Sequence, residues 1–230
     1  GGSITYPQNS AFPTVIEDEA FIFNNCTTVG NYGRCMLRLN NCSITTITTT
    51  NSGIYQVTLE ANNTSFRNIN TGSPSNLQGF AIMTSTELVI LKNCTINSDW
   101  GGVYLSGVSS VIDNCIIKSG NSWGVFRYNS GANVSNFLTI KNSTIECGNY
   151  SAVGTIYGSL GKQFDISNTT IITSGASSHC LYMNTGTYAR FDNLKLKNLA
   201  TPANILSRAD LLTENPQINT LDNLGNIVLA

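Results

Sequence analysis

The octapeptide LTIKNSTI, Leu138–Ile145, decides the fold because related stretches recur along the chain. Each copy alternates apolar and polar residues, then has an Asn, a small residue and a further apolar position. Internal repeats determine an architecture more strongly than any single motif. The other copies are FIFNNCTT from Phe21, LRLNNCSI from Leu37, LVILKNCTI from Leu88, SVIDNCII from Ser110, QFDISNTTI from Gln163, ARFDNLKL from Ala189 and, more loosely, VTLEANNTSF from Val57.

Aligning the copies on their Asn residues places residues of like character in columns. Two positions before this anchor and three after it the residues are almost all apolar, whereas the position directly before it is mostly polar. Such alternation is typical of strands with one buried face. We expect a corner at each Asn, because Asn tolerates left-handed backbone angles and hydrogen-bonds its own neighbourhood. The anchors are Asn25, Asn41, Asn63, Asn93, Asn114, Asn142, Asn168 and Asn193.

The anchors lie 16, 22, 30, 21, 28, 26 and 25 residues apart, with no amphipathic helix between them. A hairpin needs only a few residues, whereas most of these intervals suit one circuit of a solenoid whose corners stack about 4.8 Å apart. Stacking lets Lys92, Asp113 and Lys141 alternate in charge, and it places Asp165 beside Arg190. We therefore predict an all-β fold, a parallel β-helix that is right-handed by the general crossover preference.

The corner pattern, in coils of about twenty to thirty residues, resembles that of the pectate-lyase-like right-handed β-helix proteins. The resemblance covers roughly Phe21 to Leu196. That superfamily includes polysaccharide lyases and hydrolases, phage tailspikes and bacterial surface adhesins. Because the repeat is a packing motif, the resemblance implies a fold and leaves the activity open.

The repeat divides the chain into three parts. Residues 1–20 lack it and include the acidic Glu17-Asp18-Glu19, so we expect an N-terminal cap over the open end of the solenoid. Residues 21–199 form the parallel β-helix. Residues 200–230 form a C-terminal cap, in which Thr201-Pro202 predicts the start of a short helix and an apolar tail follows.

The composition argues against several partners. Charged residues are 11% of the 230 and the formal net charge is −1, so the chain lacks the footprint of a protein that binds nucleic acid or an anionic membrane. It has no run of about 18 apolar residues, so we expect no membrane insertion. The cysteine spacing follows the repeat without a CxxC zinc pattern, and we expect neither a metal nor a cofactor.

The chain has seven cysteines, and several of them stand directly after an anchor. We interpret this position as a tight interior corner, where Cys acts as a small apolar residue. In-register side chains on neighbouring coils point the same way, so we predict free buried thiols, as suits a reducing cytoplasm. The column is Cys26, Cys42, Thr64, Cys94, Cys115, Ser143 and Thr169.

A second set of strands lies between the corners, beginning at Gly79, Gly101, Trp123, Ser151 and His179. If Ala81, Val103, Val125 and Leu181 face inward, the outward residues are Ile82, Tyr104, Phe126 and Tyr182. This choice turns Arg127 inward, and the alternative exchanges Phe126 with Arg127. Exposed rings in a row need a partner, and sugar rings, sister subunits and local packing are the alternatives. The candidate glycan-binding residues are Tyr104, Phe126, Tyr128, Tyr182 and Trp123.

Carboxylates decide whether the chain could be an enzyme, because enzymes of the resembled superfamily generally use a carboxylate cluster or a Ca²⁺ site. Asp165 and Asp192 are the best candidate pair, one coil apart and offset by two residues. Strand spacings place them about 8 Å apart, within the ~6.5–9.5 Å range of inverting glycoside hydrolases. Arg190 and Lys195 crowd them, and charge pairing explains the two residues equally well.

These observations favour a non-catalytic recognition protein that binds a cell-surface polysaccharide or glycan. It would be the receptor-binding tip of a phage tail fibre or tailspike, or a surface adhesin. The alternative is a polysaccharide-degrading enzyme, a lyase or glycoside hydrolase, of the same fold. The resemblance, the outward aromatics and the apolar tail favour a homotrimer. The expected location is a virion tail assembled in the host cytoplasm, or a cell surface.

Overall fold

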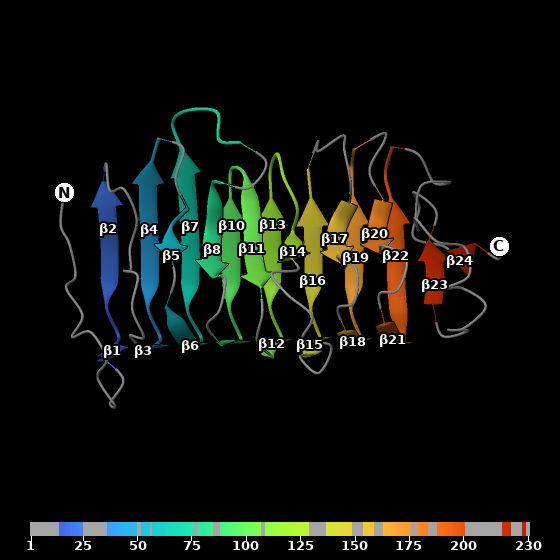
Figure 1. Cartoon of the computed structure of the whole chain (residues 1–230), viewed down its shortest axis with the longest axis horizontal. Coiled ribbons are helices and arrows are strands. Elements are labelled where there is room, and N and C mark those ends of the chain that lie inside the picture. The colour runs from blue at the N-terminus through green and yellow to red at the C-terminus, as the bar shows by residue number, and fades with distance from the viewer. Residues whose placement is uncertain are drawn as a thin grey trace.

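The computed structural model of the chain is an elongated solenoid whose strands stack side by side from one end to the other (Figure 1). Its described residues contain strands and no helix, so the predicted all-β parallel solenoid is confirmed. The structure describes residues 14–24, 36–49, 52–55, 57–75, 78–84, 88–106, 109–128, 137–148, 154–158, 163–175, 179–183, 188–200, 218–221 and 227–228.

The strands that precede the corners form an eight-stranded sheet, which we call sheet A. All its neighbouring strands are parallel, and each coil adds one strand. Its members are β1 (Thr14–Glu17), β3 (Met36–Asn40), β6 (Thr58–Asn62), β9 (Val89–Lys92), β12 (Ser110–Asp113), β15 (Phe137–Lys141), β18 (Gln163–Ser167) and β21 (Tyr188–Asp192).

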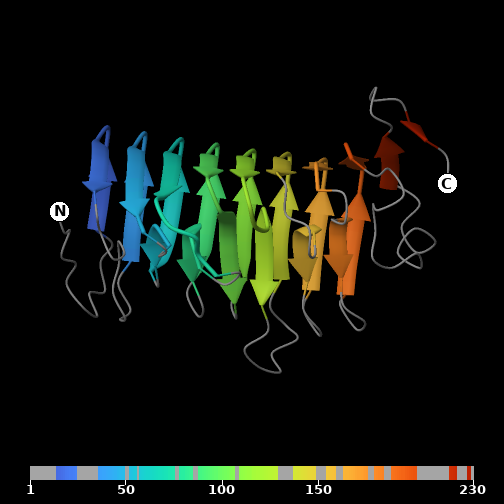
Figure 2. The ribbon, with the colours of Figure 1, turned by 90° about the horizontal axis from the view of Figure 1, so that it is seen from above.

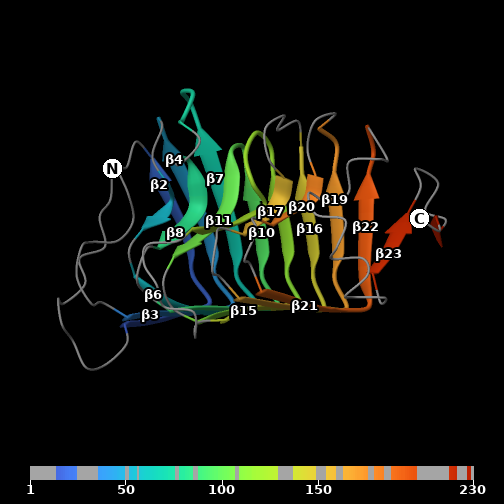
Figure 3. The same ribbon diagram turned by 45° about the vertical axis from the view of Figure 1, so that its right-hand side comes forward.

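The strands that follow the corners form the ten-stranded sheet B, and the second predicted set forms most of the six-stranded sheet C. Sheet B contains β2 (Ala20–Asn24), β4 (Ser43–Thr48), β7 (Ser65–Asn70), β10 (Thr95–Ser98), β13 (Ile116–Ser119), β16 (Thr144–Cys147), β19 (Thr170–Thr173), β22 (Leu194–Asn198), β23 (Ile218–Leu221) and β24 (Ile227–Val228). Sheet C contains β5 (Ile54–Tyr55), β8 (Phe80–Thr84), β11 (Gly101–Ser106), β14 (Val125–Tyr128), β17 (Gly154–Gly158) and β20 (His179–Met183). In Figure 3, sheet A runs along the bottom and sheets B and C rise above it.

The three sheets enclose a core made of stacked columns. The apolar positions before and after the Asn corners from Asn41 to Asn193 are buried, as the repeat predicts; Leu91 and Ile96 of one coil, for example, are fully buried. Parallel pairing in register places like residues on successive coils, so Leu91 lies beside Ala61 and Ile112. Burial of apolar area stabilises such a column by about 25 cal/mol per Å².

The corner between sheets A and B is left-handed at every described anchor. Asn41, Asn63, Asn93, Asn114, Asn142, Asn168 and Asn193 have φ between 47° and 55°, which confirms the predicted role of Asn. The backbone hydrogen bonds continue through the corner, since Asn93 N donates to Asp113 O at 3.0 Å. The coils therefore follow one another in chain order along the axis (Figure 2).

The first coil differs from the predicted alignment. Its corner is Asp18, with a φ of 55°, whereas the predicted anchor Asn25 lies outside the described residues and Phe21 belongs to β2. Asp also tolerates left-handed angles, and Ile16, Asp18 and Phe21 fit the repeat. The interval from Asp18 to Asn41 is 23 residues, which removes the short first interval. Among the described residues, the first strand of the solenoid is thus β1, which begins at Thr14, inside the segment predicted as a cap.

At the other end, β23 extends sheet B beside β22, and β24 pairs with β23 in the antiparallel sense. Part of the predicted apolar tail therefore joins the sheet. The helix predicted from Thr201-Pro202 lies outside the described residues. The right-handed coil and the two caps stay predictions.

Candidate functional site

The corner side chains form a hydrogen-bonded ladder along the outside of the solenoid. Each bond joins an amide nitrogen to a side-chain oxygen of a preceding coil, either at the corner or directly before it. The corner amides are thereby engaged with one another and fix the edge of sheet A. The bonds are Asn63 Nδ2 to Asn41 Oδ1 (2.8 Å), Asn93 to Asn62 (3.0 Å), Asn114 to Asn93 (2.7 Å), Asn142 to Asp113 Oδ1 (3.0 Å) and Asn193 to Asn168 (2.9 Å).

The column directly after the anchors faces inward and carries hydrogen-bond donors. Six of its described side chains donate to the carbonyl two residues earlier, which lies before the corner, whereas Leu194, after Asn193, is buried and apolar. Our interpretation of these cysteines as small apolar residues is therefore incomplete, because most positions of the column carry a thiol or hydroxyl donor. The donors are Cys42 (3.2 Å), Thr64 (3.0 Å), Cys94 (3.1 Å), Cys115 (3.3 Å), Ser143 (2.7 Å) and Thr169 (2.8 Å).

The cysteines in the described part of the chain are free and buried, as predicted: Cys42, Cys94, Cys115, Cys147 and Cys180. Cys94 and Cys115 stand on successive coils and share a hydrogen bond, which lowers the pKa of Cys94 and, with desolvation, raises that of Cys115. Burial raises the pKa of Cys180 to about 12. Cys115 and Cys180 are therefore protonated at neutral pH.

Four ion pairs join charged side chains on the outer faces of neighbouring coils among the described residues. On sheet A, Arg38 Nη2 lies 2.7 Å from Glu60 Oε2, and Lys141 Nζ lies 3.2 Å from Asp113 Oδ2. The predicted alternation of Lys92, Asp113 and Lys141 is confirmed by the register. On sheet B, Arg67 pairs with Asp99 and Lys118 with Glu146. Such partly exposed pairs contribute at most about 1 kcal/mol each.

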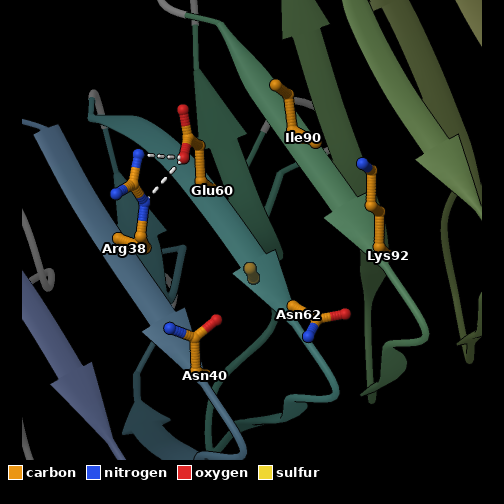
Figure 4. Close-up of a pocket in the computed structure, with 7 residues that line it drawn as sticks. Arg38, Asn40, Glu60, Asn62, Ile90 and Lys92 are labelled. Atoms are coloured by element: carbon orange, nitrogen blue, oxygen red, sulfur yellow. Dashed lines mark hydrogen bonds and ion pairs between the residues drawn. The ribbon is translucent and has the colours of Figure 1, made fainter.

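A hollow of about 420 Å³ lies on the outer face of sheet A over β3, β6 and β9. Arg38, Glu60 and Ile90 stand in one column, and the ion pair of long side chains gives way to the shorter Ile90. Figure 4 shows the pair on one side and Lys92 on the next strand, with Asn62 between them. The full lining is Arg38, Asn40, Glu60, Ala61, Asn62, Ile90 and Lys92.

A second hollow, of about 320 Å³, has the same origin on sheet B. There the ion pair of Lys118 and Glu146 is followed by Ile172 in the next coil. Both of these hollows therefore form where an apolar residue of moderate length follows a long ion pair.

The residues of the predicted aromatic row are aligned on successive strands, but several of them are buried and not exposed. The register places Tyr104, Phe126, Tyr157 and Tyr182 on successive strands of sheet C. Tyr104, Phe126 and Trp123 are only 6%, 4% and 4% exposed, and they pack with Phe80 in a second cluster. The Trp123 and Phe126 ring centroids are 4.2 Å apart, and those of Tyr104 and Phe126 are 5.1 Å apart.

The remaining members of the row are less decisive. Tyr182 is half-buried and meets the ring of His179 edge-on, at a centroid distance of 5.9 Å. The side chain of Tyr128 lies outside the described part of the chain. The described residues of this row do not form an exposed aromatic surface on which sugar rings could stack. Glycan binding by the row stays a prediction.

The phase of the second strands was predicted correctly at three strands and wrongly at one. Ile82 aligns with Val103 and is buried in the main core, so Met83 takes the outward position that was assigned to Ile82. Arg127 faces inward and is fully buried beside Leu105, as the chosen phase implied. Burial lowers the pKa of Arg127 to about 10, so it remains charged at neutral pH.

Asp165 and Asp192 lie on neighbouring strands, as predicted. Asp165 aligns with Arg190, and Asp192 aligns with Ser167, so the carboxylates are offset by two residues. This placement agrees with the predicted dyad and equally with charge pairing between Asp165 and Arg190.

Sequence reasoning missed a third column, five residues after each anchor. Its members are small or polar and buried, and several of them bind backbone groups of the turn between sheets B and C. Ser98 Oγ and Asn68 Nδ2 both donate to Gly79 O, at 3.3 and 3.1 Å, and Ser119 Oγ and Cys147 Sγ donate to Ser122 O. The regular polar residue at that position was the signal that could have revealed it. The column is Thr46, Asn68, Ser98, Ser119, Cys147, Thr173 and Asn198.

Comparison of the chain with protein-family models, with curated proteins and with solved structures found no match in any of the three. The β-solenoid fold therefore rests on the structure, and the resemblance to the pectate-lyase-like superfamily stays a prediction. Among the described residues, no group of three or more His, Cys, Asp or Glu side chains is placed to hold a metal ion. In the same part of the chain, no helix has the length and apolar character needed to cross a membrane.

Proposed function

We propose that this protein is a non-catalytic recognition protein that binds a glycan on a cell surface. It would act as the receptor-binding tip of a phage tail fibre or tailspike, or as a surface adhesin. The observation that carries the proposal is the outer face of sheet A, where polar rungs in register surround the hollow between Arg38, Glu60 and Lys92. The resemblance of the repeat to tailspikes and adhesins supports the same class.

The chemistry of this face suits a saccharide. Asn40 and Asn62 offer carboxamides to sugar hydroxyls, and Ile90 offers an apolar surface to the C–H groups of a ring. Parallel strands repeat about every 4.8 Å, so successive sugar residues can meet equivalent rungs. With a net charge of −1 the chain exerts little long-range attraction, so recognition depends on such short-range contacts.

The pairing of the carboxylates favours binding over catalysis. Glu60 and Asp113 on sheet A each form an ion pair with a cation of a neighbouring coil, so these carboxylates are already engaged. A glycosidase needs a carboxylic acid that keeps its proton and a second carboxylate on the other side of the bond. Asp165 and Asp192 are the pair on which the enzymatic alternative depends.

Retention and cleavage should be measured together on a panel of immobilised cell-surface polysaccharides. We expect retention of at least one polysaccharide without release of reducing ends. Ile90→Asp should abolish retention, whereas Ile116→Asp, the same change on the exposed face of sheet B, should not. Release that is lost in Asp192→Asn would favour the enzyme, and no retention on any polysaccharide would contradict the proposal.

We also propose a homotrimer, because weak saccharide contacts gain from several sites acting together. The burial of Tyr104 and Phe126 removes one reason for the trimer, which now rests on the resemblance and on avidity. Light scattering should give about three times the 24.7 kDa of one chain. A mass near that of one chain at micromolar concentration would contradict it.

A further inference from the structure

Lys92 is the charged residue of the sheet A hollow that has no acidic partner. It stands in register between Asn62 and Asp113, and its side chain is exposed. Both oxygens of Asp113 are engaged on the far side: Oδ2 with Lys141 Nζ at 3.2 Å, and Oδ1 with Asn142 Nδ2 at 3.0 Å. Among the described residues, no carboxylate forms an ion pair with Lys92.

The hollow therefore carries one positive charge in excess. Arg38 and Glu60 neutralise each other, since both Nε and Nη2 of Arg38 approach Glu60 Oε2, at 2.8 and 2.7 Å. Lys92 then remains as the uncompensated charge of the lining. The net charge of the chain is −1, so the excess positive charge of the hollow is a local property of one face.

Asn62 supplies a second donor beside Lys92. Its Oδ1 accepts a hydrogen bond from Asn93 Nδ2 at 3.0 Å, which fixes the orientation of the amide and leaves Nδ2 on the other side. Within the described part of the chain, Asn62 Nδ2 makes no hydrogen bond. Asn62 and Lys92 are register partners, so an amide and an ammonium donor stand on neighbouring strands at the hollow.

We propose that the hollow binds an acidic glycan, whose anionic oxygen group, a carboxylate or a sulfate ester, is held by Lys92, while Asn62 Nδ2 donates to another oxygen of the same saccharide. Hydrogen bonds between charged partners are the strong ones, so the contact with Lys92 sets the preference for an acidic ligand. Ile90 beside them packs against the ring that bears the anion. This inference rests on the proposed glycan recognition and specifies the chemical class of its ligand.

The test compares an immobilised uronate oligosaccharide, its carboxyl-reduced neutral form, and a neutral oligosaccharide with and without sulfate. We expect the wild-type protein to bind an acidic form roughly tenfold more tightly than its matched neutral form, from one charge-assisted contact. Preference for the uronate alone identifies a carboxylate, and preference for the sulfated form alone identifies a sulfate. Lys92→Gln should reduce the preference to about twofold or less, as expected when that contact is lost.

Lys118→Gln is the matched control, because it removes the same charge from an ion pair on sheet B. It should keep the preference of the wild type. Equal binding of acidic and neutral forms by the wild type would overturn the inference but not the proposed function. This comparison uses the wild-type protein alone, so it does not depend on the folding of a variant. No binding of any oligosaccharide here or of any polysaccharide in the panel would overturn both.

Discussion

At the scale of single residues, the corner depends on a backbone angle that few side chains tolerate. Asp18 shows that the requirement is the left-handed conformation and not asparagine itself. The sequence predicts the seven Asn corners, because the residue type and its spacing coincide. It missed Asp18, because the nearby Asn25 offered a competing alignment.

Asn93 tests this view, because it both donates and accepts in the ladder. We expect Asn93→Ala to lower the free energy of unfolding by about 2 kcal/mol, from the left-handed angle and the lost bonds. Asn93→Gly keeps the angle and should cost about half as much. Urea denaturation measures both, and a glycine variant less stable than the alanine variant would contradict the argument.

In the column directly after the anchors, the hydrogen bonds of the side chains could not be predicted from the sequence. Cys, Ser and Thr are all small, so the sequence predicts a tight corner; that each donates to a carbonyl two residues back follows only from the left-handed turn. A requirement for a small side chain and a requirement for a hydrogen-bond donor would both select Cys, Ser and Thr. Only the observed geometry distinguishes the two requirements.

A substitution that keeps the size and removes the donor separates the two explanations. Thr169→Val loses the bond of 2.8 Å to Ser167 O, and we expect it to cost about 1–2 kcal/mol. Cys115→Ser keeps a donor of the kind that Ser143 provides, and we expect a loss of about 1 kcal/mol or less. Calorimetric melting checks both, and a tolerated valine would show that size alone matters.

At the scale of elements, sheet C shows why the outward row was predicted only in part. Ala81 and Ile82 are consecutive and both belong to the main core, so the alternation of inward and outward residues breaks within β8. Phe80 and Met83, on either side of them, then belong to the second cluster, the one that contains Tyr104, Trp123 and Phe126. Strand prediction assumes a period of two, and the burial of two successive residues in β8 leaves no clear mark in the sequence.

Because the second cluster is buried, we expect substitutions in it to lower stability. An exposed sugar-binding surface would instead tolerate the same substitutions. Phe126→Ala should lower the free energy of unfolding by about 3–5 kcal/mol, since its ring is 4% exposed. Phe137→Ala makes the same change on sheet A, where the ring is 46% exposed, and should cost about 1 kcal/mol or less. Equal effects of the two variants in denaturant unfolding would contradict the assigned burial.

At the scale of the whole molecule, the fold was more predictable than the site. Corners and core columns repeat in every coil, so errors at one copy are corrected by the others. The hollow arises from three unlike residues in one column, Arg38, Glu60 and Ile90, and no repeat announces it. The proposed site thus lies where the chain departs from the repeat, and there a single sequence offers the least signal.

A solenoid of this kind also predicts how stability is distributed. Each interior strand of sheet A, such as β12, pairs with a neighbour on both sides. Within the part of the chain that the structure describes, β1 pairs only with β3 and β24 only with β23. In repeat architectures stability is close to a sum of nearest-neighbour terms, so the ends open before the middle. Hydrogen exchange followed by mass spectrometry should therefore be slowest in β9, β12 and β15 and fastest in β1 and β24. Equal protection along the axis would mean that the coils unfold as one unit, against the nearest-neighbour description.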